Sequence, residues 1–257
     1  MTTAIVVPCF DEEDRFDGEA LGELGRRADA RIVLVDDGST DATPGLLNAA
    51  LAGDPDRFHV VTLPANRGKG EAVRLGLRAA LAGGHDVVGY YDADLATPPA
   101  EMARLVEELR GDPARVMVIG SRVALLGHDI ERSAVRHYLG RLYATAASAV
   151  LRLPVYDTQC GAKVVRAGPA LTAALAAPFT SRWSFDVELI GRLLRGGVPA
   201  AGFVEVPLLS WSDVGGSKLR ARAALGAGLD LVRVALALRR QEASSPGSIG
   251  ASNSPTV

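Results

Sequence analysis

The fold of this chain is decided by the stretch Val87-Val88-Gly89-Tyr90-Tyr91-Asp92-Ala93-Asp94-Leu95-Ala96-Thr97-Pro98-Pro99, an apolar run that ends in two carboxylates. The short apolar part, with its β-branched and aromatic residues, predicts a buried strand over residues 87–91. Side chains alternate along a strand, so Asp92 and Asp94 can point the same way where the chain leaves the core. Two carboxylates that close repel each other, and a hard divalent cation such as Mg²⁺ or Mn²⁺ relieves the repulsion. The stretch is therefore a candidate metal-diphosphate site.

The same residues also fit a strand followed by an acidic turn. Thr97 would then be the N-cap of a helix over residues 101–110, with Pro98 or Pro99 at its first position. Taken alone, the Asp-x-Asp pattern favours this turn, because acidic residues are common in turns. The rest of the chain has to decide between the two interpretations.

Length and composition predict one large α/β domain over residues 1–241. The chain has 257 residues, 48% of them hydrophobic, and a net charge of -2, which gives no sign of a nucleic-acid partner. Cys9 and Cys160 lie far apart without a metal-binding spacing, so we expect free thiols in a reducing compartment. No signal peptide precedes the first strand, which predicts a cytoplasmic protein. Residues 242–257 are rich in Ser, Gly and Pro and predict a disordered tail.

Strands and helices alternate through the first half of the chain, which predicts a mostly parallel central sheet flanked by helices. Further on, the pattern is more helical, and residues 221–238 predict an amphipathic helix that packs on the domain or lies on a membrane surface. Strands are expected over residues 4–8, 31–35, 58–63, 87–91, 115–119, 164–165 and 203–207, and helices over residues 18–28, 43–52, 70–81, 101–110, 130–151, 171–176, 185–194 and 221–238.

Polar loops follow five successive predicted strands. Parallel sheets bind ligands beyond the carboxyl ends of their strands, so five such loops favour a ligand site over five unrelated turns. The loops are Pro8-Cys9-Phe10-Asp11-Glu12-Glu13, Asp36-Asp37-Gly38-Ser39-Thr40-Asp41, Asn66-Arg67-Gly68-Lys69-Gly70, Asp92-Ala93-Asp94 and Gly120-Ser121-Arg122.

Two of these loops suggest a nucleotide. A carboxylate of Asp36 or Asp37 can accept the imide N–H of uracil or a ribose hydroxyl, although a turn with an N-cap is an equally good reading. Gly68 and Lys69 precede a predicted helix, where a phosphate or a base edge can bind. The P-loop spacing is missing, and no Gly-x-Gly-x-x-Gly follows the first strand, which removes the usual argument for NAD.

The other polar residues give weaker signals. The four histidines lack metal-ligand spacing, and no serine lies in a Gly-x-Ser-x-Gly elbow, so a hydrolase triad has no support. Four basic residues follow the acidic motifs, and they fit either solvated faces or an anionic acceptor such as a phosphate. They are Arg122, Arg132, Arg136 and Lys218.

Together, these motifs resemble the family 2 glycosyltransferases with the GT-A fold, a Rossmann-like nucleotide-sugar-binding domain. Later motifs resemble the dolichyl-phosphate glucosyltransferase branch, close to the dolichyl-phosphate mannose synthases, and the similarity spans residues 4–220. The later motifs are Gly120-Ser121-Arg122, Asp157-Thr158-Gln159-Cys160-Gly161-Ala162-Lys163, Arg182-Trp183-Ser184-Phe185-Asp186-Val187-Glu188-Leu189 and Gly216-Ser217-Lys218.

The resemblance implies a role for each matching residue. Asp92 and Asp94 would hold the metal, Asp94 through the metal to the diphosphate. Asp94 and Arg122 would be catalytic, and Asp157 and Asp186 are candidate general bases or structural hydrogen-bond partners. Donor-binding residues would be Pro8, Phe10, Glu12, Asp36, Asp37, Gly68, Lys69 and Asp92, and acceptor-binding residues would be Arg122, Arg132, Arg136 and Lys218.

The resemblance thus implies an inverting, metal-dependent enzyme that moves a hexose, glucose from UDP-glucose first among them, to polyprenyl phosphate at the inner membrane face. Three departures concern this expectation: Phe10-Asp11 replaces the family's Tyr-Asn, Ala162 replaces an aromatic residue, and no membrane helix precedes the first strand. A soluble small-molecule acceptor is the alternative. A binding protein without catalysis is a third class, against which the Asp92 and Asp94 pair argues.

Overall fold

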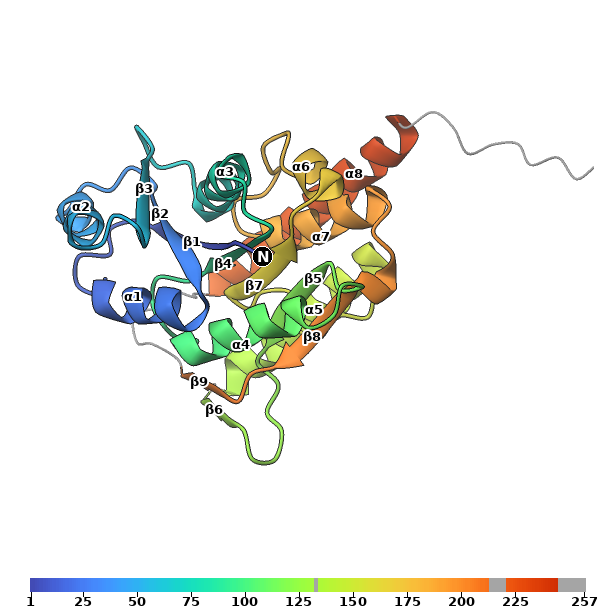
Figure 1. Ribbon diagram of the computed structural model, residues 1–257. Coiled ribbons are helices and arrows are strands. Elements are labelled where there is room, and N and C mark those ends of the chain that lie inside the picture. Colours follow the sequence, from blue (N-terminus) through green and yellow to red (C-terminus); the bar gives the residue numbers. More distant parts are fainter. Residues whose placement is uncertain (132–133, 213–220, 245–257) are drawn as a thin grey trace, which may run out of the picture.

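A seven-stranded sheet forms the centre of the computed structural model, which describes residues 1–131, 134–212 and 221–244 (Figure 1). Six strands are parallel, and β7 alone in this sheet is antiparallel to its neighbours. In spatial order the strands are β3 (Phe58–Thr62), β2 (Ala30–Asp36), β1 (Thr3–Cys9), β4 (Val87–Tyr91), β7 (Ala162–Arg166), β5 (Met117–Ser121) and β8 (Phe203–Pro207). The mostly parallel α/β class is confirmed.

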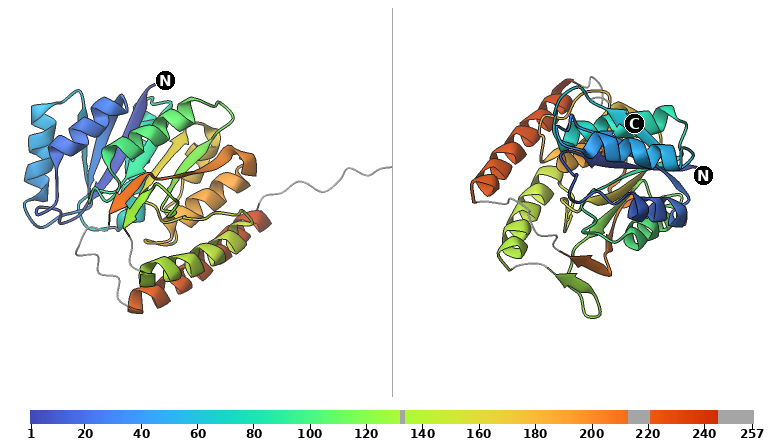
Figure 2. Two further views of the ribbon diagram at one scale, coloured as in Figure 1. Left: turned by 90° about the horizontal axis from the view of Figure 1, so that it is seen from below. Right: turned by 90° about the vertical axis from the view of Figure 1, so that its left-hand side faces the viewer.

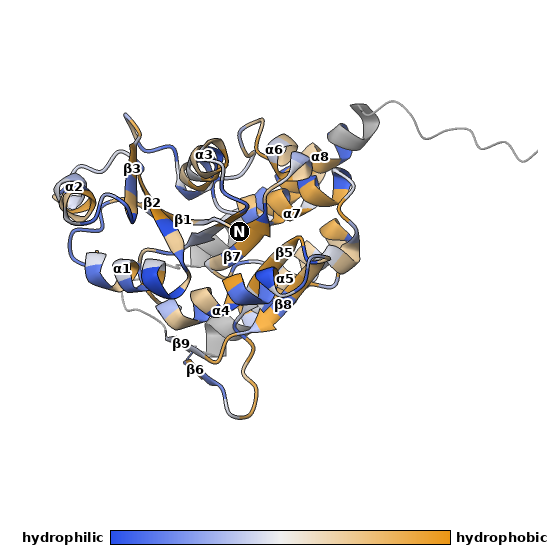
Figure 3. Ribbon diagram, viewed as in Figure 1, coloured by the Kyte–Doolittle hydropathy of each residue, from blue (hydrophilic) through white to orange (hydrophobic). Residues whose placement is uncertain are grey.

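Helices cover both faces of this sheet, so the chain forms three layers (Figures 1 and 2). Each face has its own apolar core, which is why the strands are mostly hydrophobic (Figure 3). One face packs against α1 (Gly18–Arg27), α2 (Thr43–Gly53) and α4 (Pro99–Arg110). The other packs against α3 (Lys69–Ala82), α5 (Ala134–Leu151), α6 (Pro169–Ala174), α7 (Phe185–Arg195) and α8 (Ala221–Ser244).

Strand β7 places an antiparallel strand between β4 and β5. It follows α5 in the chain and pairs with both parallel strands, with Gly89 opposite Val164 and Val118 opposite the same residue. The carboxyl ends of the parallel strands therefore share one edge with the amino end of β7. This arrangement brings the residues just before β7 to the same edge as the loop after β4.

The structure shifts several predicted boundaries. Residues 130–131 belong to β6 (Asp129–Glu131), which pairs with β9 (Ser210–Ser212), so the helix predicted from residue 130 begins at Ala134 instead. Pro99 occupies the first position of α4 and Pro98 is its N-cap residue, so the N-cap role considered for Thr97 is wrong. Residues 242–244 of the predicted tail continue α8.

Helix α8 packs one side against α7 and α5 and leaves the other side exposed. Leu231, Val234 and Leu238 are buried in the core, whereas Leu229 and Val232 are exposed. None of the helices described here is long and apolar enough to cross a bilayer. Cys9 and Cys160, by contrast, are buried free thiols, as the sequence predicted.

Candidate active site

The two carboxylates that end β4 lie at the carboxyl edge of the sheet. The backbone N–H of Asp92 donates to the carbonyl of Gly161 at 3.0 Å, and Asp94 Oδ1 accepts the N–H of Ala96 at 3.1 Å. Leu95, the residue after Asp94 in this turn, has φ +55°, a left-handed conformation that is rare for a branched residue. Backbone strain of this kind gathers at functional sites. The left-handed backbone at Leu95 therefore favours a functional site over an ordinary acidic turn.

Lys69, at the first position of α3, reaches Asp92. Its Nζ lies 2.6 Å from Asp92 Oδ1, with side chains 43% and 31% exposed, so water and ligands can reach this ion pair. Burial opposes ionisation of Asp92, but the nearby cations, Lys69 first and then Lys163 and Arg122, together outweigh it, and the pKa of Asp92 is lowered. Burial and then the charge of Asp92 raise the pKa of Asp94. The two acids have unequal proton affinities because, within the described part of the chain, Asp92 has a cation at contact distance and Asp94 does not.

Gly161 gives Asp92 its space. A Cβ atom added to Gly161 would lie 2.1 Å from Cγ and Oδ2 of Asp92, which no real structure tolerates. The carboxylate of Asp92 therefore lies directly over the Gly161 backbone. Any side chain at position 161 would push it away, so Gly161 positions Asp92.

The residues at this edge fit a hard divalent cation. Asp92 Oδ1 and Glu12 Oε2 are buried atoms without a hydrogen bond, although each lies in an ion pair. Burial is the main cause of the raised pKa of Glu12, and the charges of Asp94 and Asp92 add to it. Among the described residues, no three His, Cys, Asp or Glu side chains gather closely enough to hold a metal by themselves. A metal here would need oxygens from a ligand and water, as Mg²⁺ and Mn²⁺ commonly do.

The loops after β2 and β3 are fastened to each other by Asp37. Its Oδ1 and Oδ2 accept the backbone N–H groups of Arg67 and Gly68, both at 2.7 Å, and the side chain is buried. Gly38 has φ +72°, and a Cβ there would lie 2.5 Å from the Ala65 carbonyl carbon. Asp37 thus supports the loop that carries Lys69. Its predicted contact with a nucleotide base stays a prediction.

The loop after β1 joins the same rim. Asp36 Oδ1 accepts the N–H of Ser39, and Asp37 N–H donates to the carbonyl of Cys9. The N–H of Glu12 donates to the Thr43 hydroxyl at 2.8 Å. The Phe10 side chain is 41% exposed in this loop, and Pro8 precedes it in β1. The loops after β1, β2 and β3 can therefore line one binding site at the carboxyl ends of these strands.

Asp157 is committed to Arg122. The guanidinium donates to both carboxylate oxygens at 2.7 and 2.8 Å, and the backbone N–H groups of Arg122 and Gln159 donate to them as well. Trp211 stacks on Arg122, with 5.3 Å from the guanidinium carbon to the ring centre. A carboxylate with this set of donors is a poor proton acceptor. The structure therefore favours the structural alternative for Asp157 over the general base.

Asp186, at the start of α7, is also tied to a cation. Lys163 Nζ lies 2.6 Å from its Oδ1, Tyr90 donates its hydroxyl to the same atom, and Lys163 is completely buried. Lys163 also donates to the carbonyl of Cys160. The charges of Asp92 and Asp186 both raise the pKa of Lys69, so these two acids lie near the same ammonium group. The structural alternative is favoured here too.

The structure describes most, but not all, of the cationic residues that the sequence analysis assigned to the site. Lys69, Lys163 and Arg122 lie close enough to Asp92 for their charges to lower its pKa. Arg136 lies in the first turn of α5. Arg132 and Lys218, in contrast, lie outside the described residues.

Sequence reasoning missed three residues that shape the edge. Gly161, Lys163 and Tyr90 were quoted only as parts of longer motifs. The signal for Gly161 was its position before a strand, where glycine often marks close backbone approach. Lys163 carried a stronger signal, because a lysine inside an apolar strand must find a partner for its charge.

Comparisons with known proteins identify the family of the chain. A sequence model described as "Glycosyl transferase family 2" matches residues 4–170. The chain is 31% identical over 231 residues to the dolichyl-phosphate beta-glucosyltransferase of Mus musculus, covering 84% of this chain and 69% of that protein. It is 27% identical to the polyprenol monophosphomannose synthase of Mycolicibacterium smegmatis, covering 85% and 83%.

A solved structure shares the fold. Glucosyl-3-phosphoglycerate synthase from Mycobacterium tuberculosis, crystallised with Mn²⁺, uridine-diphosphate and glucosyl-3-phosphoglycerate, superposes with a TM-score of 0.64. The match covers 96% of this chain and 81% of that chain at 21% sequence identity. The fold is therefore the GT-A fold that the sequence motifs implied.

Proposed function

The chain belongs to glycosyl transferase family 2, and from this membership we propose that it transfers a hexose from a nucleotide diphosphate sugar to polyprenyl phosphate. One relative named above is called a dolichyl-phosphate glucosyltransferase and the other a polyprenol monophosphomannose synthase, and both names support a lipid phosphate as acceptor. Glucose and UDP are the preferred donor components, since one relative is a glucosyltransferase and the superposed enzyme holds UDP.

The main observation in favour of a phosphate acceptor is that both candidate general bases, Asp157 and Asp186, are hydrogen-bonded to cations. Arg122 donates hydrogen bonds to Asp157 and Lys163 donates one to Asp186, so each carboxylate is already engaged by a cation and not turned toward an acceptor hydroxyl. A phosphate acceptor needs no such base, because its oxygen is already an anion. The arrangement therefore fits attack by phosphate better than attack by an alcohol.

In the proposed reaction, an acceptor phosphate oxygen attacks C1 of the sugar while the bond from C1 to the diphosphate oxygen breaks. The electron pair of that bond leaves with the nucleoside diphosphate, and the configuration at C1 inverts. Asp92 and Asp94 would hold Mg²⁺ or Mn²⁺, which neutralises the departing diphosphate. Lys69 lies beside Asp92 and adds positive charge on the donor side of that bond.

Contact with the membrane is proposed through the outer face of α5 and α8. These helices lie side by side (Figure 2), and the face exposes uncharged side chains that would otherwise be unusual on a surface. Such a face can rest among lipid headgroups while the sheet edge receives the acceptor. The exposed residues are Tyr138, Leu139, Leu142, Leu229, Val232 and Leu236.

Nucleotide release from a panel of donors tests this proposal. UDP-glucose and GDP-mannose would each be incubated with Mn²⁺ and one of three acceptors: polyprenyl phosphate, the corresponding polyprenol, or 3-phosphoglycerate. We expect polyprenyl phosphate alone to stimulate release above hydrolysis. Stimulation by 3-phosphoglycerate would support the soluble acceptor, and stimulation by polyprenol would refute the argument from the engaged bases.

A further inference from the structure

Lys163 is a completely buried lysine in an apolar strand, and the proposed reaction does not use it. Its neighbours in β7, Ala162 and Val164, are also fully buried. A charge in such surroundings loses its hydration, and an ion pair there is often no more stabilising than apolar side chains of the same size. Stability alone therefore does not explain a charge at this position.

The ammonium group of Lys163 joins three segments of the chain. Its Nζ lies 2.6 Å from Oδ1 of Asp186, at the start of α7, and it donates to the carbonyl of Cys160, before β7. The Tyr90 hydroxyl donates to the same Asp186 oxygen, and Nζ lies 5.1 Å from the centre of the Tyr90 ring. Because Tyr90 and Lys163 are opposite each other in the pairing of β4 with β7, these contacts link the sheet, α7 and the turn before β7.

The contact with Cys160 reaches the carboxylate edge. This carbonyl belongs to the peptide bond between Cys160 and Gly161, so a hydrogen bond to it fixes the plane of that peptide. The next carbonyl, of Gly161, accepts the N–H of Asp92 at 3.0 Å. The Asp92 carboxylate also lies on the Gly161 backbone, where an added Cβ would be 2.1 Å from its Cγ. The path from Lys163 to Asp92 therefore passes through one rigid peptide and the Gly161 backbone.

A second buried ion pair on α7 has a different set of contacts. Arg192 and Glu188 lie 2.7 Å apart, and this pair is as buried as Lys163 and Asp186. The Arg192 guanidinium donates to the carbonyls of Ala174, Ala177 and Pro178. These carbonyls lie in α6 and the segment after it, so this pair joins α6 to α7. The carbonyl that Lys163 binds, in contrast, adjoins the carboxylate edge.

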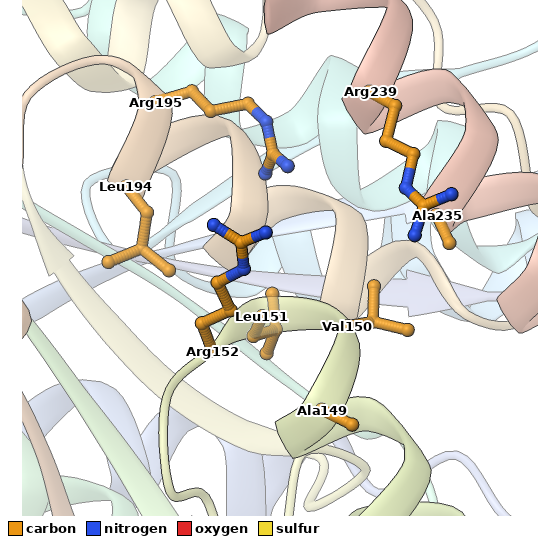
Figure 4. Close-up of a pocket in the computed structure, with 8 residues that line it drawn as sticks. All are labelled: Ala149, Val150, Leu151, Arg152, Leu194, Arg195, Ala235 and Arg239. Carbon is orange, nitrogen blue, oxygen red and sulfur yellow. The ribbon is translucent and has the colours of Figure 1, made fainter.

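The two ends of α7 also have different surroundings. In its last turn, Leu194 and Arg195 line a cavity together with residues of α5, of α8 and of the segment after α5 (Figure 4). Its first turn carries Asp186 and contacts the Lys163 ammonium. Lys163 thus fastens the end of α7 that lies at the carboxylate edge.

We propose that Lys163 positions Asp92: its ammonium holds the peptide between Cys160 and Gly161, and that peptide in turn supports the Asp92 carboxylate. The Lys163 side chain has no exposed surface, so it touches no ligand and is a positioning residue, not a catalytic one. Without its hydrogen bond, the turn before β7 can tilt and move Asp92 out of place. The inference rests on the proposed function, because it takes Asp92 as a ligand of Mn²⁺ or Mg²⁺.

Binding of Mn²⁺ to the full chain with UDP or GDP tests the proposal, and the electron paramagnetic resonance signal of free Mn²⁺ measures it. Lys163→Met removes the ammonium but leaves Asp186 buried without its partner. It is therefore compared with K163M/D186L, in which apolar side chains replace both charges. Arg166→Met is the control, because Arg166 lies in the same strand opposite Val87, at the end of β4 away from Asp92, and donates to three backbone carbonyls.

We expect both Lys163 variants to raise the Kd for Mn²⁺ about tenfold or more, because groups that orient a metal ligand typically contribute a factor of this size. K163M/D186L should recover the urea midpoint that Lys163→Met loses, while its Mn²⁺ affinity stays low. Arg166→Met should lower the urea midpoint and leave the Kd near that of the unmodified chain.

The outcomes separate the positioning role from the proposed function. An unchanged Kd in K163M/D186L, or an equal rise in Arg166→Met, would overturn the positioning role and leave the transfer reaction in place. Weakened Mn²⁺ binding in both Lys163 variants of a chain that polyprenyl phosphate does not stimulate would support the positioning role and refute that acceptor. If the unmodified chain binds no Mn²⁺ with either nucleotide, both proposals are wrong.

Discussion

Two pairs of carboxylates at the same sheet edge have opposite surroundings. Asp157 and Asp186 are each held by a buried cation, Arg122 or Lys163, and Lys163 has no exposed surface. Asp92 forms its ion pair with Lys69, which is 43% exposed, and Asp94 has no cation at salt-bridge distance among the described residues. Asp157 and Asp186 thus hold parts of the fold together, whereas Asp92 and Asp94 remain accessible to ligands. An acid at a sheet edge is thus a candidate metal ligand only when no buried cation already neutralises it.

Replacement of Asp94 by Asn breaks the open pair and should have the largest effect. The variant removes a carboxylate that we propose as a metal ligand, so kcat should fall at least about 10³-fold. Turnover with a Mn²⁺ titration measures this loss, and circular dichroism checks the fold. A rate within tenfold of the unmodified enzyme would remove Asp94 from the metal site.

Replacement of Gly161 by Ala displaces the carboxylate of Asp92 without removing it. Because a shift of about 1 Å can cost about 10²-fold, we expect a fall of that size in kcat and a higher Mn²⁺ requirement. Gly45→Ala in α2 is the matched control, since nothing lies within 4 Å of the added Cβ there. An unchanged Mn²⁺ requirement would mean that Gly161 acts only on folding.

Replacement of Lys69 by Met leaves Asp92, like Asp94, without a cation at salt-bridge distance in the part of the chain that the structure describes. The ammonium lowers the pKa of Asp92, so its removal should raise that pKa, and activity should be lost at a higher pH on acidification. The donor KM should also rise about tenfold, because a cation beside the diphosphate is lost. The pH profile of kcat/KM gives the first result. An acid limb that stays in place would contradict the link between Lys69 and Asp92.

Replacement of Asp157 by Asn should act on stability more than on turnover. It leaves the buried Arg122 without its carboxylate, which costs about 3 kcal/mol of unfolding free energy. Urea unfolding measures this change, and the double variant R122M/D157L should recover much of it. A loss in kcat above about 10³-fold with unchanged stability would restore Asp157 as a general base.

Much of the fold followed from local patterns in the sequence. Strand β4 was predicted at its observed bounds, and the alternation of strands and helices through residue 110 was confirmed, because each element is encoded by its own apolar spacing. Strand β7 was recognised, but its antiparallel position between β4 and β5 was not. Pairing in a sheet is a long-range choice, and no local pattern near residue 164 encodes it.

The site divides in the same way. The sequence by itself determined which side chains follow each strand, and therefore that Asp92, Asp94, Asp37 and Lys69 would share one edge. Only the tertiary structure decided which acids are neutralised, because Arg122 and Asp157 are 35 residues apart and Lys163 and Asp186 are 23 apart. The charge state and reach of a carboxylate depend on what packs against it. Packing of that kind brings together residues that no sequence pattern joins.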